Sequence, residues 1–553
     1  MKVFGSVSTV LAAAACALAL TACGGDGGDS ASASTPVTPA TPTPVTPVTP
    51  PPAPKPDQFW LTITPSSVDI TAYVDEAAKV SITAKSGKTF TKPVNVAIVD
   101  KSGVFSTDVK ITALSELEYR ADLQTSAALP VGQRTVDLEL RLCEDDPKVC
   151  SVPVAGSPWL IPVKVNVLAA TNLTPLGVLS NVANWSTYQG NASHSAYVPA
   201  AFDPGKFSRR WALPALTDGD LATSPAHDNG RLFASLTDSR DATSDGGLLK
   251  AVLVAYSEES GKELWRADFG PSSHMNPPAA ANGKVYVVAK DCCDTFFWVF
   301  DQATGKLLSK TNMRSPLWPN RAPTIFGDEV YANSNFSDGA LIKFSATTLE
   351  QVWQSSVREF RYWTPAVDDS HAYASIGGSL YAVETGNGKH AFTITDPEPI
   401  SDSGYIVGVA LSGDGMAYTV HAGDLRAFDL PGRKLAWKVG GTAIGAPALA
   451  RSAVYVLNKH ETGQNEGGAV LEARDAATGA LQWTSDLLPK GSYWLVATQN
   501  LAFVSSDDRT VAIDLATHRI VWDHPAGGEL SISNRGVLYI GGEGGKITAI
   551  NLR

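Results

Sequence analysis

The segment "LVATQNLAFVSSDDRTVAIDLATHRIVW" (Leu495–Trp522) contains four short runs rich in apolar and β-branched residues, separated by turn residues. Such runs, bounded by Asn, Asp, Ser and Gly, are typical of β-strands joined by tight turns. The turn "DLATHR" precedes the last run, which ends in tryptophan. The segment therefore predicts one four-stranded antiparallel sheet.

The same pattern recurs along the last two-thirds of the chain. Successive unit ends are 39 to 46 residues apart, and T-G-K-like turns open several of the fourth strands. Four-stranded units of this length predict the blades of a β-propeller. Tryptophans that recur with the unit are expected to pack between blades. The unit ends are Trp265, Ser309, Trp353, Phe392, Trp437, Trp483 and Trp522.

The two ends of the repeat region are incomplete and complementary. "SRRW", ending at Trp211, supplies an outermost strand without inner strands, and "VLYIGGEGGKITAINLR" (537–553) supplies inner strands without a fourth. Pairing of the two would close the ring and remove exposed sheet edges. We therefore expect an all-β fold with an eight-bladed propeller closed by strands from both ends.

Residues 185–553 resemble the PQQ-like β-propeller repeat family. The resemblance rests on the repeated blade pattern and on the opening "WSTYQGNASHSAYVPAAFDPGKFSRRW" (185–211), which is similar to the lead-in of that family. The family includes PQQ-dependent alcohol dehydrogenases and a lipoprotein scaffold of the outer-membrane barrel-assembly machine. The resemblance thus implies either a quinoprotein or a binding scaffold.

Two further segments precede the propeller. Residues 58–168 show short alternating runs at the spacing of an immunoglobulin-like β-sandwich. Residues 23–57 are dominated by Pro, Thr, Ala and Val, which favours an extended stalk, and residues 169–184 are interpreted as a second linker. In "CEDDPKVC", Cys143 and Cys150 are expected to form a disulfide across a short hairpin.

Residues 1–22 are typical of a signal peptide, with an apolar core that ends in "LTAC". This motif resembles the lipobox of bacterial lipoproteins and implies lipidation of Cys23. A plain secretory signal with a chance cysteine is the alternative. Because Gly24 and not Asp follows the cysteine, we expect the outer membrane, facing the periplasm or the cell surface. The lipid would be the only membrane attachment.

The formal net charge of the chain is −11. Such a balance disfavours nucleic acid and anionic membrane surfaces as partners. We therefore expect an envelope protein or a polymer as the partner, and a monomeric chain.

One face of the predicted disc carries the second-to-third strand turns and the connections between blades. We call it the connection face. The longest insertions and many Trp, Tyr, Arg and His residues fall there, which indicates a binding surface. The predicted partner-binding residues are His274, Trp318, Arg321, Arg361, Trp363 and Trp494.

The same face carries the vicinal pair Cys292–Cys293 in "DCCD". With the other cysteines assigned, the pair can bond only to itself or stay reduced. It resembles the vicinal disulfide that some PQQ-dependent alcohol dehydrogenases hold against the quinone. A structural pair in a tight turn and a redox-sensitive turn are the alternatives.

We expect neither catalytic nor metal-binding residues. No Glu, Asn and Asp cluster can be assigned to the calcium of a quinoprotein, and His227, His371 and His518 are interpreted as isolated surface or turn residues. The leading hypothesis is a non-catalytic, lipid-anchored scaffold without cofactor at the bacterial cell envelope. The alternative is a PQQ- and calcium-dependent alcohol dehydrogenase that uses the same face.

Overall fold

The computed structural model describes residues 58–553 except 75–76, 108, 170, 215–223, 239–248, 273, 291–293, 314–321, 335–339, 358–362, 399–407, 451 and 461–467. The chain divides into two compact units at Val167 and Leu168. The described residues are all-β, as the sequence predicts, with strands joined by turns and short 3-10 segments. Among them, no helix has the length and apolar character needed to cross a membrane.

The first unit consists of two four-stranded sheets that enclose one apolar core. Alternating residues of β7 and β8 point into this core, among them Leu138, Leu140, Ile161 and Val163. The first sheet has the order β1 (Leu61–Thr64), β3 (Lys79–Ser86), β6 (Glu118–Gln124), β5 (Lys110–Ala113), and the second β2 (Val68–Tyr73), β8 (Trp159–Leu168), β7 (Gly132–Cys143), β4 (Asn95–Asp100).

The described residues of the second unit form eight sheets. Six of them have four strands, and two have a fifth short strand, β16 in one and β9 in the other. Sheet 1 consists of β11 (Ala226–Asp228), β12 (Arg231–Asp238), β13 (Leu249–Ser257) and β14 (Glu263–Ser272). Sheet 2 consists of β15 (His274–Met275), β16 (Ala279–Ala281), β17 (Lys284–Lys290), β18 (Thr295–Asp301) and β19 (Leu307–Asn312). Sheet 3 consists of β20 (Thr324–Phe326), β21 (Glu329–Ser334), β22 (Ala340–Ser345) and β23 (Gln351–Ser356), and sheet 4 of β24 (Ala366–Val367), β25 (His371–Ile376), β26 (Ser379–Glu384) and β27 (His390–Ile394).

The remaining four sheets follow the same strand order from the centre outward. Sheet 5 consists of β28 (Ala410–Leu411), β29 (Met416–His421), β30 (Asp424–Asp429) and β31 (Lys434–Val439). Sheet 6 consists of β32 (Ala443–Ala450), β33 (Ala453–Lys459), β34 (Ala469–Asp475) and β35 (Leu481–Thr484). Sheet 7 consists of β36 (Trp494–Thr498), β37 (Leu501–Ser505), β38 (Thr510–Asp514) and β39 (Ile520–His524), with β9 (Tyr197–Val198) beside β36. The closing sheet is β40 (Glu529–Ile532), β41 (Val537–Gly541), β42 (Ile547–Asn551) and β10 (Ser208–Leu213).

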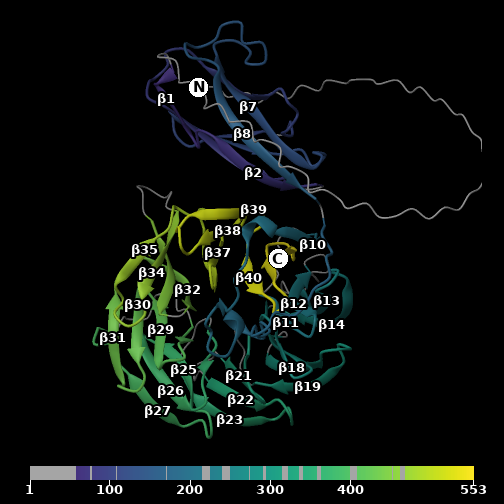
Figure 1. The fold of residues 1–553 in the computed structure, drawn as a ribbon, viewed down its shortest axis with the longest axis vertical. Coiled ribbons are helices and arrows are strands. Elements are labelled where there is room, and N and C mark those ends of the chain that lie inside the picture. Colours follow the sequence, from purple (N-terminus) through teal and green to yellow (C-terminus); the bar gives the residue numbers. More distant parts are fainter. Residues whose placement is uncertain are drawn as a thin grey trace, which may run out of the picture. The chain divides into compact units, whose positions relative to one another are not determined.

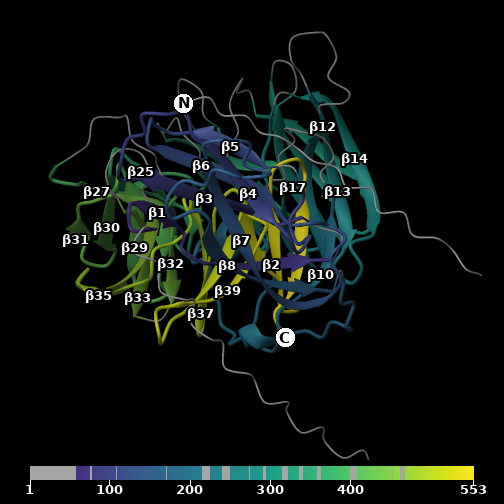
Figure 2. The same ribbon diagram turned by 90° about the horizontal axis from the view of Figure 1, so that it is seen from above.

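These sheets follow one another around a ring, from teal through green to yellow (Figure 1). Sheets 1 and 5 lie on opposite sides of it in both views (Figure 2). The ring closes where β10 pairs antiparallel with β42, including Trp211 beside Ala549. This pairing confirms the predicted closure by strands from both ends of the repeat region.

The segment that leads from the first unit into the ring is bound to the closing sheet. The Asn172 amide donates to the Arg209 carbonyl oxygen at 2.9 Å, and the Leu179 amide donates to Asn534 at 2.7 Å. Leu176 and Val182 join the apolar clusters of the ring. From Asn172 onward, the segment predicted as a linker is therefore part of the second unit.

A buried arginine fixes this closure. The Arg210 guanidinium is fully buried, and it donates to the carbonyl oxygens of Thr174 at 2.6 Å, Glu258 at 3.0 Å and Glu259 at 2.7 Å. It also donates to the Asn551 side chain at 3.1 Å. One side chain thus joins the segment around Thr174, which leads from the first unit into the ring, to sheet 1 and to the closing sheet.

Neighbouring sheets are joined by a tryptophan that lies on a glycine. Trp437, on the outermost strand of sheet 5, donates its indole N–H to the Ala476 carbonyl of sheet 6 at 3.0 Å. A Cβ on Gly479, in the last turn of sheet 6, would lie 2.7 Å from the Trp437 ring. The same arrangement joins Trp211 to Gly261, Trp265 to Gly305 and Trp353 to Gly388.

At other junctions the tryptophan, the glycine or both are replaced by another residue. Phe392 lies under the Arg433 guanidinium at 4.8 Å, and Trp483 stacks on His518 at 4.3 Å. Leu349 occupies the turn position after Ser309, the one unit end without a ring. Arg433, His518 and Leu349 all keep the positive φ of the glycines. The backbone of this turn is therefore constant, and its side chain complements the preceding sheet.

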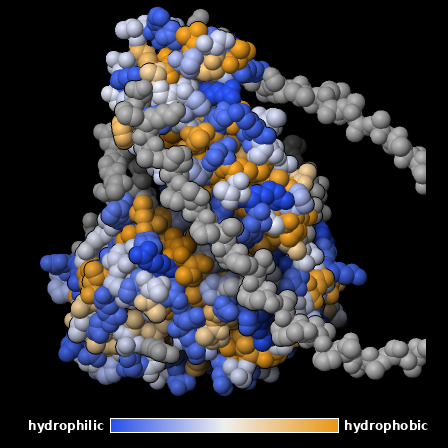
Figure 3. All heavy atoms as spheres, turned by 45° about the horizontal axis from the view of Figure 1, so that its top comes forward, coloured by the Kyte–Doolittle hydropathy of each residue, from blue (hydrophilic) through white to orange (hydrophobic). Residues whose placement is uncertain are grey.

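The outermost strands leave some apolar side chains in solvent. On the face drawn in Figure 3, hydrophobic residues form patches between hydrophilic ones. Side chains at the starts of these strands, next to the unit-end positions, are among the most exposed apolar groups of the second unit: Leu264, Leu308, Val352 and Val521.

We predict that Gly479→Ala lowers the free energy of unfolding by about 3 kcal/mol. Alanine would both adopt φ near +74° and collide with the Trp437 ring. Gly283→Ala is the matched control, because Gly283 has φ +72° and open space around its Cβ position. It should cost only about 1 kcal/mol.

Urea unfolding of both variants measures the difference. Combining Gly479→Ala with Trp437→Ala should cost less than the sum of the single changes, since the smaller side chain removes the collision. Equal losses for Gly479→Ala and Gly283→Ala would show that the ring contact does not limit this position.

Candidate functional site at the mouth of the central channel

The lead-in segment Trp185–Val198 passes along the centre of the ring and contacts sheets 1 to 7 in turn. The carbonyl oxygens of Trp185 and Ser186 accept from sheets 1 and 2, and the Thr187 hydroxyl donates to sheet 3. Further along, carbonyl oxygens of the segment accept backbone N–H groups of sheets 4 to 7 at 2.8 Å. The donors are Val367, Leu411, Leu449 and Ala497. The centre of the ring is thus occupied by the chain itself.

His194 is the most buried titratable group of this segment. Its Nδ1 lies 3.1 Å from the Val409 carbonyl oxygen and its Nε2 lies 3.0 Å from the Thr324 hydroxyl. Because a carbonyl only accepts, Nδ1 carries the proton. Burial lowers the pKa of His194 to about 3, against the opposing effect of the Val409 hydrogen bond. The ring is therefore neutral at physiological pH and holds sheets 3 and 5 to the lead-in segment.

Above this segment, a small pocket of about 50 Å³ opens between the starts of several innermost strands. Tyr493 and Trp494 meet edge to face there, with their ring centroids 5.7 Å apart. Innermost strands begin at the connection face, so this pocket is the mouth of the channel on that face. Its walls are formed by Trp185, Tyr188, Gln189, Ser224, Ala446, Tyr493, Trp494, Leu495, Val496, Glu529 and Leu530.

Two buried polar atoms belong to residues that line this mouth. The indole N–H of Trp185 and the side-chain oxygen of Gln189 have no hydrogen-bond partner among the described residues. Gln189 donates through Nε2 to the Pro447 carbonyl oxygen at 3.3 Å and has φ +51°. Unpaired buried polar atoms are costly, so a donor and an acceptor next to a pocket are suited to a polar guest or water.

Of the predicted partner-binding residues, Trp494 reaches this mouth, where its side chain is partly exposed. Trp363 does not. Only 2% of its surface is exposed, and it packs with Trp353 and Val367 in the cluster between sheets 3 and 4. The expectation that Trp363 is presented to a partner is wrong, because the connection that carries it turns into the interface between two sheets.

The other predicted positions fall outside the described side chains. Trp318, Arg321, Arg361 and the Cys292–Cys293 pair lie outside the described residues. His274 is placed only by its backbone, which pairs with Lys290 in sheet 2.

A buried histidine cluster was missed by the sequence interpretation. His227, expected at the surface or in a turn, is buried on β11, with Nε2 2.7 Å from Ser531 Oγ and Nδ1 3.6 Å from Glu258 Oε1. The Tyr539 hydroxyl donates to the same carboxylate at 3.1 Å. A serine, a histidine and a carboxylate can form a catalytic triad, but the side chain of Ser531 is fully buried in this structure. The cluster joins sheet 1 to the closing sheet.

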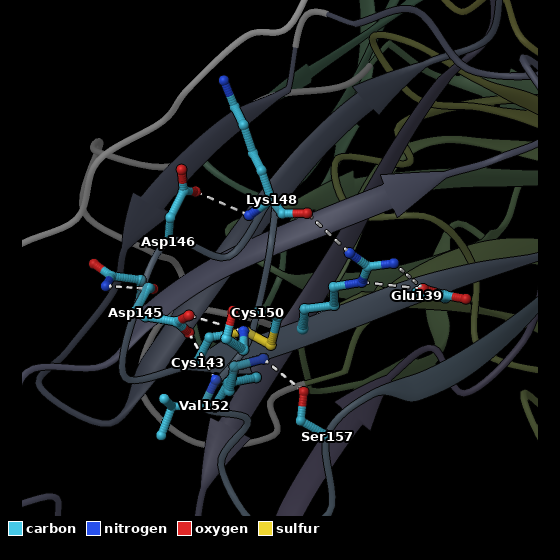
Figure 4. The surroundings of a disulfide bond; sticks show 12 residues. Glu139, Cys143, Asp145, Asp146, Lys148, Cys150, Val152 and Ser157 are labelled. Atoms are coloured by element: carbon cyan, nitrogen blue, oxygen red, sulfur yellow. Dashed lines mark hydrogen bonds and ion pairs between the residues drawn. A yellow bond between two sulfur atoms is a disulfide. The ribbon is translucent and has the colours of Figure 1, made fainter.

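Within the described part of the chain, one group of acidic, histidine or cysteine side chains has its possible metal-ligand atoms close enough together to hold a metal ion. It consists of Cys143, Asp145 and Cys150, but the two sulfur atoms form a disulfide (Figure 4). Asp145 accepts the backbone N–H groups of Ser151 and Val152 at 2.8 and 3.1 Å. The group therefore braces a hairpin of the first unit.

Among the described residues, the mouth forms a pocket smaller than the site that pyrroloquinoline quinone would need. Small-molecule sites typically enclose ~300–1,000 Å³, whereas this pocket has about 50 Å³. A quinone with several carboxylates would also face the carboxylate of Glu529, and like charges in a partly buried site repel. Its described residues suit a shallow contact with a small group.

A ring of four-stranded antiparallel sheets, closed by strands from both ends and docked by tryptophan, defines a β-propeller of the PQQ-like repeat class. A family model described as "Outer membrane protein assembly factor BamB" matches residues 194–335, 249–456, 296–524 and 421–553. The chain belongs to this family.

Two solved structures are among those similar to the chain. Quinohemoprotein alcohol dehydrogenase from Comamonas testosteroni is 14% identical, covers 68% of this chain and 81% of its own, and has a TM-score of 0.51. BamB from Moraxella catarrhalis is 16% identical over 62% of this chain and 99% of its own, with a TM-score of 0.46. No curated protein sequence matches the chain.

Acidification should destabilise the fold through His194. Its pKa is about 3 in the folded chain and ~6.5 when unfolded. The unfolded state therefore binds more protons between these values, and stability present above pH ~6.5 is lost as pH falls. Between pH 8 and pH 5 this histidine should cost about 2 kcal/mol of unfolding free energy.

Urea unfolding at both pH values tests this expectation with two variants. His194→Asn should be less stable at pH 8 but lose about 2 kcal/mol less on acidification. Thr324→Val removes the same hydroxyl contact without removing the titrating group, so it should keep the full loss. An unchanged loss in His194→Asn would assign the acid sensitivity to other groups.

Proposed function

We propose that this protein is a non-catalytic scaffold of the bacterial cell envelope, an eight-bladed propeller that binds a protein or polymer partner at the mouth of its channel. The lipid at Cys23 would hold it to the outer membrane behind the Pro/Thr-rich stalk. The observation that carries the proposal is the filling of the channel by the lead-in segment. It leaves a shallow aromatic mouth rather than a reaction chamber.

Three other observations support a binding role. The family is described as an assembly factor, a description that names assembly and no reaction. The buried Ser531, His227 and Glu258 have no access to substrate. Tyr493 and Trp494 at the mouth are residues of the kind that dominates binding energy when a partner covers them.

Truncation of Trp494 should weaken partner binding by more than ~2 kcal/mol, about thirtyfold in affinity, since large aromatic side chains act as anchors. The measurement is quantitative capture of the same envelope partner by wild type and Trp494→Ala. Phe59→Ala is the control, because Phe59 is an exposed aromatic residue of the first unit.

The control also locates the site. Capture that survives Trp494→Ala and fails with Phe59→Ala would move partner binding from the channel mouth to the first unit. A lowered melting temperature in both variants with unchanged capture would likewise contradict a role of the mouth.

Addition of PQQ and calcium to the purified protein should leave its absorption spectrum unchanged and produce no dye-linked alcohol oxidation. The physical reason is the small pocket above the lead-in segment. A melting temperature that rises with both additions together, and with neither alone, would instead favour the quinoprotein alternative.

A further inference from the structure

A second, larger pocket lies between sheets 5 and 6, apart from the channel mouth. Its volume is about 210 Å³. It is bounded by Gly440–Thr442, which connect the two sheets, and therefore opens on the connection face. Its apolar walls are Leu425, Val439, Ala443, Val456 and Val470, and its polar groups are Asn458, Lys459, His460, Glu472 and Arg474.

Two charged residues line this pocket at positions that are apolar in sheets 2, 3 and 7. Glu472 and Arg474 flank Ala473, the residue that pairs with Trp483. The corresponding residues in sheet 3 are Ile342 and Phe344, which are buried in an apolar cluster. Trp298 and Phe300 in sheet 2, and Val511 and Ile513 in sheet 7, occupy the same positions.

The two charged side chains satisfy each other and leave little net charge. Arg474 donates through Nε at 2.8 Å to Glu472 Oε2, its Nη2 lies 2.6 Å from the same oxygen, and its Nη1 donates to the Gly479 carbonyl. The exposed Lys459 ammonium has no ion pair in the described part of the chain. Among the described residues that line the pocket, Lys459 is therefore the cation left to pair with a ligand, although the chain as a whole carries −11.

One rim of the pocket is formed by two glycines. Gly440 and Gly441 both lie outside the left-handed region; a Cβ on Gly441 would lie 3.8 Å from the Asn458 side-chain oxygen, and one on Gly440 would lie 3.5 Å from Asp424 Oδ1. The glycines are thus not required by backbone strain. Their effect is to leave the main chain open beside the apolar wall, where another extended chain can approach.

We propose that this pocket binds an extended acidic peptide segment of a partner. A carboxylate of the segment would pair with Lys459, an adjacent apolar side chain would pack on Val439 and Val470, and the peptide backbone would lie along Gly440 and Gly441. The inference rests on the proposed scaffold function only in taking the peptide to be part of a partner protein.

Calorimetric titration of the purified chain tests this pocket directly. The probes are the blocked hexapeptide acetyl-TVTVEV-amide and its versions with glutamine or lysine in place of glutamate. The acidic peptide should bind about fivefold more tightly than the neutral one, as an exposed ion pair allows. The lysine peptide should bind more weakly still.

Two pairs of variants separate the pocket from the rest of the surface. Gly441→Leu should fill it and weaken binding about tenfold or more, whereas Gly413→Leu, also in open space and without positive φ, should leave binding unchanged. Lys459→Glu should reverse the preference between acidic and basic peptides, and Lys389→Glu, in a turn on the opposite face, should not.

Equal affinity for the three peptides, absence of binding, or wild-type binding by Gly441→Leu would each overturn the proposal. These titrations use no envelope extract, so they are independent of partner capture through Trp494. Failure here with Trp494-dependent capture intact removes only the peptide site.

Discussion

The ring depends on one contact, a tryptophan of one sheet resting on a glycine turn of the next. An indole ring buries a large apolar area, and its N–H donates to a carbonyl oxygen of the neighbouring sheet, as Trp437 does to Ala476. Glycine is needed beneath it because a Cβ would lie inside the ring's contact distance. Each such contact fixes the position of one sheet against the next, and the eight sheets together form a ring.

The same contact explains where the ring needs other solutions. At the last junction no turn follows Trp522, because the closing sheet takes its outermost strand from the start of the repeat region. Phe207 occupies this place, with its ring centroid 5.3 Å from that of Trp522. Arg210 and the buried cluster around His227 and Glu258 then hold the closing sheet to sheet 1. These hydrogen bonds add to the docking of Trp211 on Gly261, which also joins the closing sheet to sheet 1.

Filling of the channel determines the shape of the described centre of the ring. The lead-in segment is hydrogen-bonded to seven sheets, and the pocket above it among the described residues is small. Two surface features are available for binding. One is the pair of aromatic rings at the mouth, and the other is the pocket between sheets 5 and 6, which has apolar walls and Lys459 at its edge. Both features lie on the connection face, where loops vary while the sheets are held by packing.

Sequence alone determined the strands, the repeat and the closure, because strand alternation and turn residues are local and the spacing of 39 to 46 residues reveals the unit. It also identified the packing tryptophans and the terminal strand that completes the ring. The family followed from these local features, since a propeller repeats one short pattern many times.

Tertiary structure alone decided which side chains meet. His227 and Ser531 are 304 residues apart and share no local pattern, so their contact was invisible in the sequence. Trp363 is a residue type typical of surface anchors but is buried, because it packs with Trp353 and Val367 between two sheets. The pocket at Glu472 and Arg474 likewise appears only when their positions are compared between sheets. Packing between sheets depends on contacts that the linear order does not encode locally.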